Sequence, residues 1–563
     1  MNVRNTGIVY TQSAKCRDCY RCLRVCPVGA IGIRDGQAYI DDDKCIKCGT
    51  CIRECPQKAK TYRKDLDDAR TLLASGKVVA ASIAPSFAAA YPGWMTERVP
   101  SALRMLGFSY VLETSDGARL TAEATVEKAK YQKCGGICTA CPAVVNYTEK
   151  YKPDMIDKLI KVVSPMIAHA RQIKRSFGSD CKVIFIGPCV AKKSEAERKE
   201  YEGVVDVVLT FEELDEWLKH EKIDLRNMPE SGFESFDGCC DARLFPIPGG
   251  MLRTGGVEND GTIMNVMHAS GSESVMEMFS LSEENWNFSL IEPLFCREGC
   301  INGPAIGTKA NIYERRNNVI KYAARERNLN KTIEPVSVSL FTEYSADPPL
   351  AGPGYSEDEI MEVYSRTGKT SDEFQLNCGA CGFSSCRKMA IAVLEGNAEI
   401  DMCMPYMRRM AESRKDLIIE TSPNGIVILD ERLTISSMNP AFRKNFLCSD
   451  AVLGRKISYL MDDIGFEKVA SGSEEKYESV IEFNGAKYHQ LVYRLGDAHY
   501  VGIFSDISRI RLNENVLDEL RHQTAEKAGE LLKHQLDMAE KVAMLLGEST
   551  AKSEELLERL MGK

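Results

Sequence analysis

Short apolar runs in the middle of the chain predict strands that are buried on both faces. The clearest runs are residues 78–82, 183–186 and 204–209, and more polar segments separate them. Amphipathic stretches at residues 154–175 and 211–222 predict helices between these strands. Strands that alternate with helices favour a mostly parallel sheet with helices on its faces.

The C-terminal third of the chain shows a different alternation. Residues 426–430, 488–494 and 500–507 have strand patterns, and Asn439-Pro440-Ala441-Phe442 predicts the start of a helix. This order resembles a PAS domain, whose ligand the sequence does not reveal. We expect His489 and His499 to be strand residues rather than ligands.

The last 53 residues carry apolar positions spaced by threes and fours, interrupted by small residues and Gly547. This pattern predicts a helical tail that binds a partner, with a homodimer as the expected assembly. Proline and glycine breaks near residues 303 and 348–354 predict the end of the α/β domain and a linker after it.

Composition narrows the class of protein. The chain has 563 residues, a net charge of −9 and 22 cysteines. It has no run of 18 apolar residues, and residues 1–10 lack the apolar core of a signal peptide. We therefore expect a cytoplasmic protein of several domains with reduced cysteines, and neither a membrane nor a nucleic acid as partner.

Eight cysteines near the N-terminus form two runs of C-x2-C-x2-C-x3-C-P. In this bacterial ferredoxin pattern, the fourth cysteine of each run ligates the cluster of the other run. We assign one [4Fe-4S] cluster to Cys16, Cys19, Cys22 and Cys55, and a second to Cys45, Cys48, Cys51 and Cys26. Zinc is the weaker interpretation, because zinc sites use pairs of ligands rather than eight thiols in a double pattern.

Positive charge is concentrated in the same segment. Residues 1–65 carry 13 Lys and Arg against 7 Asp and Glu. One interpretation is that these residues offset the negative charge of two thiolate-ligated clusters. The other is a docking face for an acidic electron carrier.

Three further segments place cysteines in distinctive contexts. They are Thr139-Ala140-Cys141-Pro142, Pro188-Cys189-Val190-Ala191-Lys192-Lys193-Ser194-Glu195, and Glu292-Pro293-Leu294-Phe295-Cys296-Arg297-Glu298-Gly299-Cys300-Ile301-Asn302-Gly303. Their combination and order resemble the active-site motifs of [FeFe] hydrogenases, the iron-only hydrogenase large-subunit family.

The resemblance implies an H-cluster, a [4Fe-4S] cubane joined to a two-iron subsite with CO, cyanide and azadithiolate ligands. By motif match, Cys141, Cys189 and Cys296 hold the cubane, and Cys300 bridges to the subsite. The implied catalytic positions are Cys300, Lys192, Glu195 and Ala140, and the implied cofactor contacts are Pro188, Lys192, Gly187 and Leu294. Soft thiolates are suitable ligands for such a cluster.

Departures from the family pattern concern proton transfer. Ala140 stands where catalytic members have a proton-carrying cysteine, and Ile160 falls at the position of the usual serine. The usual glutamate has no clean match, with Thr125 nearest and Glu123 and Glu127 offset. Gly187 and Leu294 replace two methionines beside the two-iron subsite. Positioned acid–base groups contribute about 10²–10⁴-fold, so slow turnover is expected.

A second small cysteine motif follows the α/β domain. Cys378-x2-Cys381-x4-Cys386-x16-Cys403 resembles a small iron–sulfur domain, in which a helix over residues 387–400 returns the fourth thiolate for one further [4Fe-4S] cluster. Zinc is the alternative ligand. Six cysteines remain unassigned, of which Cys138 is a candidate for a substitute proton route: Cys134, Cys138, Cys181, Cys239, Cys240 and Cys448.

The predicted fold is multidomain, α+β and α/β. The predicted order is a two-cluster ferredoxin-like domain (1–68), an H-cluster domain (75–345), a linker (346–372), a small 4Fe-4S domain (373–411), a PAS domain (412–510) and a helical or coiled-coil signalling tail (511–563). The small domain stands between the H-cluster domain and the PAS domain, which suggests a redox link between those two.

Chains of this organisation resemble sensory [FeFe] hydrogenases. The resemblance implies weak cleavage or production of H2, an electron carrier such as ferredoxin, and a separate signalling kinase or phosphatase bound through the tail. Two alternatives stay open. One is a ferredoxin-linked hydrogenase with an unorthodox proton path, and the other is a non-catalytic iron–sulfur scaffold without the two-iron subsite.

Overall fold

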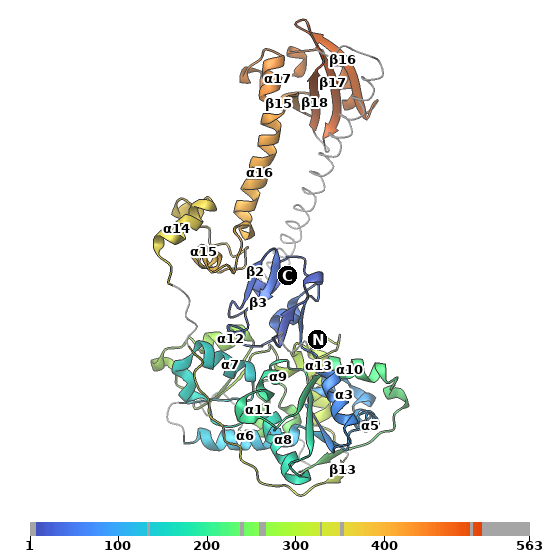
Figure 1. The fold of residues 1–563 in the computed structure, drawn as a ribbon, viewed down its shortest axis with the longest axis vertical. Helices are drawn as coiled ribbons and strands as arrows, with labels where there is room; N and C mark the ends of the chain where they lie inside the picture. Colours follow the sequence, from blue (N-terminus) through green and yellow to red (C-terminus); the bar gives the residue numbers. More distant parts are fainter. Residues whose placement is uncertain are drawn as a thin grey trace. The chain divides into compact units, whose positions relative to one another are not determined.

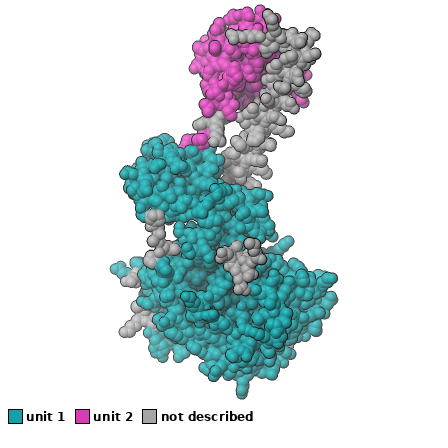
Figure 2. Space-filling model, viewed as in Figure 1, with its two compact units in different colours: residues 1–407 teal, residues 408–563 magenta. Residues whose placement is uncertain are grey.

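The computed structural model describes residues 7–131, 135–236, 241–257, 266–326, 329–348, 354–495 and 499–508. It divides into two compact units, residues 1–407 and 408–563 (Figure 2). Cys134, Cys239, Cys240 and the predicted tail lie outside the described residues. Within the described ranges, no helix combines the length and apolarity needed to cross a membrane.

The N-terminal segment forms two small antiparallel sheets. Strand β1 (Val9–Thr11) pairs with β4 (Lys60–Tyr62), and β2 (Ile31–Arg34) pairs with β3 (Gln37–Ile40). One short helix lies within each cysteine run and carries its third cysteine: α1 (Arg21–Arg24) contains Cys22 and α2 (Thr50–Glu54) contains Cys51. Each helix is preceded by a residue in the left-handed region, Tyr20 at φ 56° and Gly49 at φ 74°, so the chain turns tightly between neighbouring cysteines.

A six-stranded parallel sheet forms the centre of the first unit (Figure 1). Its order is β13 (Leu329–Thr332), β10 (Phe233–Ser235), β6 (Tyr110–Glu113), β5 (Val79–Ile83), β8 (Lys182–Gly187) and β9 (Val207–Thr210). Every residue of β5 is buried, as the apolar run predicts. The helices of this domain include α3 (Leu66–Ala74), α4 (Phe87–Ala90), α5 (Val99–Met105), α6 (Ser115–Ala129), α8 (Pro165–Phe177), α10 (Phe211–His220) and α13 (Ile312–Ala323).

The single helix predicted for residues 154–175 is wrong in its first half. A 3-10 helix over Pro153–Lys158 is followed by extended chain, and α8 begins only at Pro165. The extended residues are buried and bonded across the domain: Ile160 N–H donates to the Ile137 carbonyl at 2.9 Å, and Val163 N–H to that of Leu340 at 2.9 Å. Tertiary pairing therefore overrides the local helical pattern.

A second, three-stranded parallel sheet has the order β11 (Val266–Ser270), β12 (Leu290–Leu294) and β7 (Gly136–Ile137). Four short helices accompany it: α7 (Pro142–Tyr151), α9 (Ala191–Ala196), α11 (Gly250–Thr254) and α12 (Ser272–Met278). Three cysteines directly follow strands of the two sheets. Cys141 lies beyond β7, Cys189 beyond β8 and Cys296 beyond β12, and carboxyl ends of parallel strands are the usual place for a site.

A buried ion-pair cluster joins the N-terminal segment to the central domain. The Lys193 ammonium lies 3.0 Å from Asp65 and 3.1 Å from Glu213, and it donates to the Val208 carbonyl at 2.7 Å. Lys193 and Glu213 are fully buried. Pairing with two carboxylates is what makes burial of this lysine tolerable.

The small cysteine segment folds around two helices, α14 (Glu357–Arg366) and α15 (Cys386–Leu394). Helix α14 lies inside the segment predicted as a linker, and its Ile360, Val363 and Tyr364 pack in one cluster with Cys386 and Ala390. The predicted helix over 387–400 ends at Leu394, because the chain turns through Gly396 at φ 69°. A 3-10 turn (Ile400–Met402) then precedes Cys403.

Helix α16 (Met404–Thr421) leads to the second unit, a five-stranded antiparallel sheet in the order β15 (Ile435–Met438), β14 (Gly425–Asp430), β18 (His499–Asp506), β17 (Ala486–Leu495) and β16 (Lys476–Phe483). Two helices accompany the sheet: α17 (Pro440–Asn445) and α18 (Ile464–Ala470). Asn439 joins these elements, because its amide accepts from the N–H groups of Ile426 and Phe442. His489 and His499 both lie in strands.

Candidate metal centres

The two N-terminal cysteine runs meet as interleaved sets. The pKa of Cys22 is raised by burial and by the charges of Cys19, Cys16 and Cys55, while the charge of Lys60 opposes the rise. The pKa of Cys51 is raised by burial and by Cys48, Cys45 and Cys26. Each set thus combines three thiols from one run with the fourth from the other.

The central domain brings four further thiols together. Burial raises the pKa of Cys189 to about 11, and the neighbouring charge of Cys141 adds to this. Burial likewise raises the pKa of Cys296 and of Cys300, and both thiols feel the charges of Cys189 and Cys141. The thiols come from the start of α7, the loop before α9, and the loop and 3-10 turn (Gly299–Asn302) after β12.

The chemistry of this donor set fits a polynuclear metal centre. Cys189, Cys296 and Cys300 resist deprotonation, because burial and the charges of neighbouring thiolates raise their pKa. A bound metal removes that cost by replacing protons with positive charge. Among the described residues, no group of three or more His, Cys, Asp or Glu side chains is arranged to hold a metal ion. A cubane is held by one thiolate at each corner, and the four cysteines supply that number of donors.

A buried cation lies beside the central thiols. The Lys192 ammonium pairs with the Glu195 carboxylate at 2.7 Å and donates to the Ala140 carbonyl at 3.4 Å. Its charge opposes the rise in the pKa of both Cys189 and Cys300. Pro188 faces the last loop, since its carbonyl accepts the N–H of Ala305 at 3.1 Å. Lys192 therefore lies within electrostatic reach of two of the thiols, and Glu195 is paired with it.

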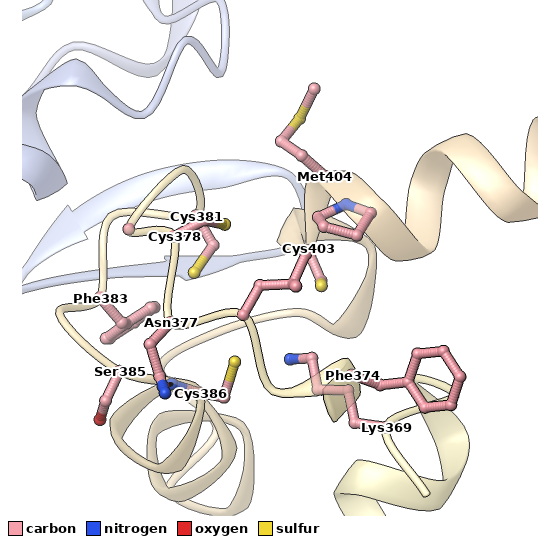
Figure 3. Close-up of a pocket in the computed structure, with 13 residues that line it drawn as sticks. Lys369, Phe374, Asn377, Cys378, Cys381, Phe383, Ser385, Cys386, Cys403 and Met404 are labelled. Carbon is pink, nitrogen blue, oxygen red and sulfur yellow. Dashed lines mark hydrogen bonds between the residues drawn. The ribbon is translucent and has the colours of Figure 1, made fainter. Parts of the chain in front are cut away.

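The small domain forms a pocket around its own four cysteines (Figure 3). The sulfur atoms of Cys378, Cys381, Cys386 and Cys403 point into this pocket, and so does the ammonium of Lys369 (Figure 3). Lys369 is 4% exposed, and its charge opposes the rise that burial causes in the pKa of Cys381. Lys369 precedes the cysteine motif, and no spacing rule in the sequence indicates it.

Comparison with known proteins shows what the central domain is similar to. Residues 77–304 match the family described as iron only hydrogenase large subunit, C-terminal domain. The chain is related to the iron-only hydrogenases. Residues 15–59 match a 4Fe-4S dicluster domain, and residues 375–405 match a family described as an Fe-S cluster.

Among curated proteins, the chain is 25% identical over 394 residues to the NADP-reducing hydrogenase subunit HndD of Solidesulfovibrio fructosivorans, covering 59% of this chain and 63% of that protein. It is 25% identical over 283 residues to iron hydrogenase 1 of Clostridium pasteurianum, covering 41% and 49%. It is 36% identical over 91 residues to the cytosolic Fe-S cluster assembly factor NAR1 of Kluyveromyces lactis, covering 16% and 19%. The chain therefore aligns with less than two thirds of each of these relatives.

Solved structures give two further similarities. An [FeFe]-hydrogenase HydA1 from Chlamydomonas reinhardtii is 17% identical with a TM-score of 0.41, covering 50% of this chain and 99% of that one. A PAS domain of an HTR-like protein from Haloarcula marismortui is 25% identical with a TM-score of 0.16, covering 18% and 99%.

The departures from the hydrogenase pattern have visible structural consequences. A Cβ atom added at Gly187 would lie 2.8 Å from the Phe185 ring and 3.2 Å from the Ala84 Cβ, so this chain fills the space a methionine would need. Leu294 is buried. Ile160 is buried, and its carbonyl accepts the Thr139 hydroxyl at 3.1 Å.

Neither offset glutamate is a buried relay group. Glu123 and Glu127 are exposed on α6, and Glu123 pairs with Arg119 at 2.8 Å, whereas Thr125 is buried. The structure instead places Glu292 in the interior. Burial raises the pKa of this carboxyl to about 7, and its charge raises the pKa of the buried Cys138. Glu292 is the first residue of the cysteine motif over residues 292–303, but only the fold shows that it is buried.

Proposed function

We propose that the chain is a sensory [FeFe] hydrogenase, which binds H2 and cleaves or produces it slowly at an H-cluster in residues 77–304. This proposal rests mainly on the convergence of four thiols next to the buried Lys192–Glu195 pair; the thiols are those of Cys141, Cys189, Cys296 and Cys300. Donor type, donor number and a nearby cation all fit an anionic iron centre.

Each group of residues would have a distinct role at the proposed H-cluster. Cys141, Cys189 and Cys296 would hold the cubane, and Cys300 the junction with the two-iron subsite. The bound group would supply the redox-active iron and the base that split H2. Lys192 offers a buried ammonium to anionic ligands, and Glu195 fixes its position through the 2.7 Å pair. Pro188 and Leu294 are buried next to Cys189 and near Cys296 in the sequence, and they would help to keep water from the centre.

The rest of the chain supports a relay and a signalling output. The two N-terminal sets and the small domain are proposed to hold three [4Fe-4S] clusters that exchange electrons with a carrier such as ferredoxin. The C-terminal five-stranded domain is proposed to be a PAS domain that passes the signal to a kinase or phosphatase.

Infrared spectroscopy of the full chain, matured with the di-iron cofactor, tests this proposal under argon and then under H2. CO and cyanide bands that shift with H2, together with slow turnover, are the expected result. A Cys300→Ser variant should lose the bands, whereas Cys181→Ser, in the buried core of the parallel sheet, should retain them. Absence of the bands after maturation would indicate a cluster scaffold, the alternative that the NAR1 similarity favours.

A further inference from the structure

The small cysteine domain lies against the first cysteine loop of the ferredoxin-like segment. The Arg24 guanidinium donates to the Cys19 carbonyl at 3.0 Å and to the Ala380 carbonyl at 3.4 Å. Cys19 belongs to the first thiol set, and Ala380 lies between Cys378 and Cys381. One side chain therefore bridges the two cluster-binding loops.

Next to this bridge, the Gly382 backbone lies against the side chains of Leu23 and Arg24. A Cβ atom added there would lie 2.0 Å from Leu23 Cδ2 and 3.4 Å from Arg24 Cγ. Leu23 is 5% exposed and belongs to one apolar cluster with Cys22, Ala392 and Met402, against which Cys16, Cys381 and Phe383 pack. The absence of a side chain at Gly382 allows this packing.

Polar contacts extend the interface over the β2–β3 hairpin. The Ile33 N–H donates to the Asn397 carbonyl at 2.8 Å, and the Gly36 N–H donates to Glu399 Oε1 at 2.9 Å. Lys44 pairs with Glu395 at 3.3 Å. Backbone, side-chain and apolar contacts thus all hold the same two surfaces together.

On its other side, the ferredoxin-like segment contacts the hydrogenase domain. Cys48 packs in the same apolar cluster as Cys141 and Cys189, and Arg53 donates to the Asn302 carbonyl at 3.3 Å. The second thiol set therefore adjoins the central site, and the first adjoins the small domain.

We propose that Leu23, Arg24, Ala380 and Gly382 form an intramolecular docking face that makes the small domain the direct redox partner of the first ferredoxin-like cluster. Cys16, Cys19, Cys22 and Cys55 would hold the donor cluster, and Cys378, Cys381, Cys386 and Cys403 the acceptor cluster. One electron would pass between them, so that the first would be oxidised and the second reduced, and no bond or proton would change. The inference rests on the proposed function only for the presence of iron–sulfur clusters. The sequence suggested that the small domain links the H-cluster domain to the PAS domain, whereas the proposed face connects the small domain to the first ferredoxin-like cluster.

The test uses the full chain with reconstituted iron–sulfur clusters, fully reduced, and measures magnetic coupling between clusters by electron paramagnetic resonance. Gly382→Asn places a side chain against Leu23 while asparagine tolerates a left-handed backbone. Gly396→Asn is the matched control, since Gly396 also has a positive φ, 69°, but has no atom within 4 Å of an added Cβ. Iron analysis verifies that all variants carry their clusters.

Arg24→Gln provides a second perturbation outside the small domain, with the exposed Arg17→Gln as its charge-matched control on the same loop. Amide hydrogen exchange at Ile33 reports docking independently of any cluster spectrum, because its N–H is bonded to Asn397 across the interface.

Wild type, Gly396→Asn and Arg17→Gln are expected to show magnetic coupling between the first ferredoxin-like cluster and the small-domain cluster. Gly382→Asn and Arg24→Gln are expected to lose this coupling. In the test variants, exchange at Ile33 should become at least about tenfold faster. Leu23→Ala combined with Gly382→Asn should restore the coupling in part. Uncoupled clusters in reduced wild type, or coupling and exchange unchanged in Arg24→Gln, would overturn the proposal. Because no H2 or di-iron cofactor is used, these outcomes are independent of the infrared test of function.

Discussion

The protonation of Glu292 gives the most direct quantitative test of the central site. This side chain is 2% exposed on β12 and accepts the N–H groups of Met251 and Leu252 at 3.3 and 3.4 Å. Burial raises its pKa from 4.5 to about 7, and the two N–H donors limit the rise. We expect a neutral carboxylic acid in the folded chain at pH 6.

The sign of the linked stability effect follows from this shift. Between pH 4.5 and 7 the folded chain keeps a proton that the unfolded chain has already lost. The free energy of unfolding therefore falls as pH rises through this window, by about 3 kcal/mol in total at about 1.4 kcal/mol per pKa unit. Between pH 5.5 and 8 the loss is about 2 kcal/mol.

Replacement by glutamine removes this pH dependence. Glu292→Gln should gain about 2 kcal/mol relative to wild type when pH is raised from 5.5 to 8. Urea unfolding followed by tryptophan fluorescence measures it, because Trp94, Trp217 and Trp286 all lie in the central domain. Glu273→Gln, an exposed carboxylate on α12, is the control substitution.

Infrared titration checks the ionisation itself. A carboxylic acid C=O band should disappear in wild type with a midpoint near pH 7 and be missing in Glu292→Gln. If that band persists in the variant, or if the stability difference between the two chains does not change with pH, the assignment of a protonated Glu292 is refuted.

Three further substitutions test other features of the structure. Lys369→Met removes the buried ammonium in the small-domain pocket and should lower that cluster's reduction potential by about 60 mV, a tenfold shift for a one-electron couple. The exposed Lys388→Met should leave the potential unchanged. A redox titration followed by electron paramagnetic resonance measures both potentials. Lys193→Met leaves the buried Glu213 without its cation and Asp65 with Arg63 as its remaining cation, and it should destabilise the chain by about 3–5 kcal/mol in thermal unfolding. The exposed Lys199→Met should have little effect. Gly187→Met introduces the residue that is usual in the family, and it should lower the free energy of unfolding by about 1–3 kcal/mol in the same assay, because the new side chain collides with the Phe185 ring. Unchanged stability would show that the ring can move aside.

The parallel α/β organisation and the thiol groupings were accessible from the sequence for different reasons. Strands such as β5 are buried on both faces and therefore appear as short continuous apolar runs. Cysteine spacing is visible because a cubane demands three thiols on one tight loop. The grouping of Cys55 with the first run follows from the ferredoxin pattern, and Cys22 indeed feels its charge.

The features that escaped prediction all depend on tertiary contacts. The segment over residues 159–163 has an amphipathic pattern, yet its backbone bonds to Ile137 and Leu340 across the domain. Gly187 looks like a simple loss of methionine until the Phe185 ring is seen in its place. Lys369 lies nine residues before Cys378 and comes beside it only through the turn after α14. Local patterns hold no information about such partners.

The structure also bears on the two interpretations of the basic N-terminal segment. Lys60 is buried, and its charge opposes the rise in the pKa of both Cys22 and Cys51, so one cation serves both thiol sets. The charge of Arg53, an exposed residue, opposes the rise in the pKa of Cys296 in the central domain. Buried or partly buried cations interact strongly with an anionic cluster because water screens them little, so these charges favour the interpretation that they offset cluster charge.

Other basic residues of the segment are engaged within the chain. Arg24 and Lys44 bind the small domain, and Arg21 pairs with Glu54 at 2.6 Å. Arg17 and Lys58 are exposed, which makes them the candidates for contact with an acidic carrier. A carrier that used them should lose affinity steeply with added salt, because exposed charges are screened over about 10 Å at 0.1 M ionic strength. The potentials of the clusters should change little under the same conditions, since the buried Lys60 acts on both thiol sets from inside the protein. The salt dependence of carrier affinity and of cluster potential therefore distinguishes basic residues that bind a carrier from basic residues that offset cluster charge.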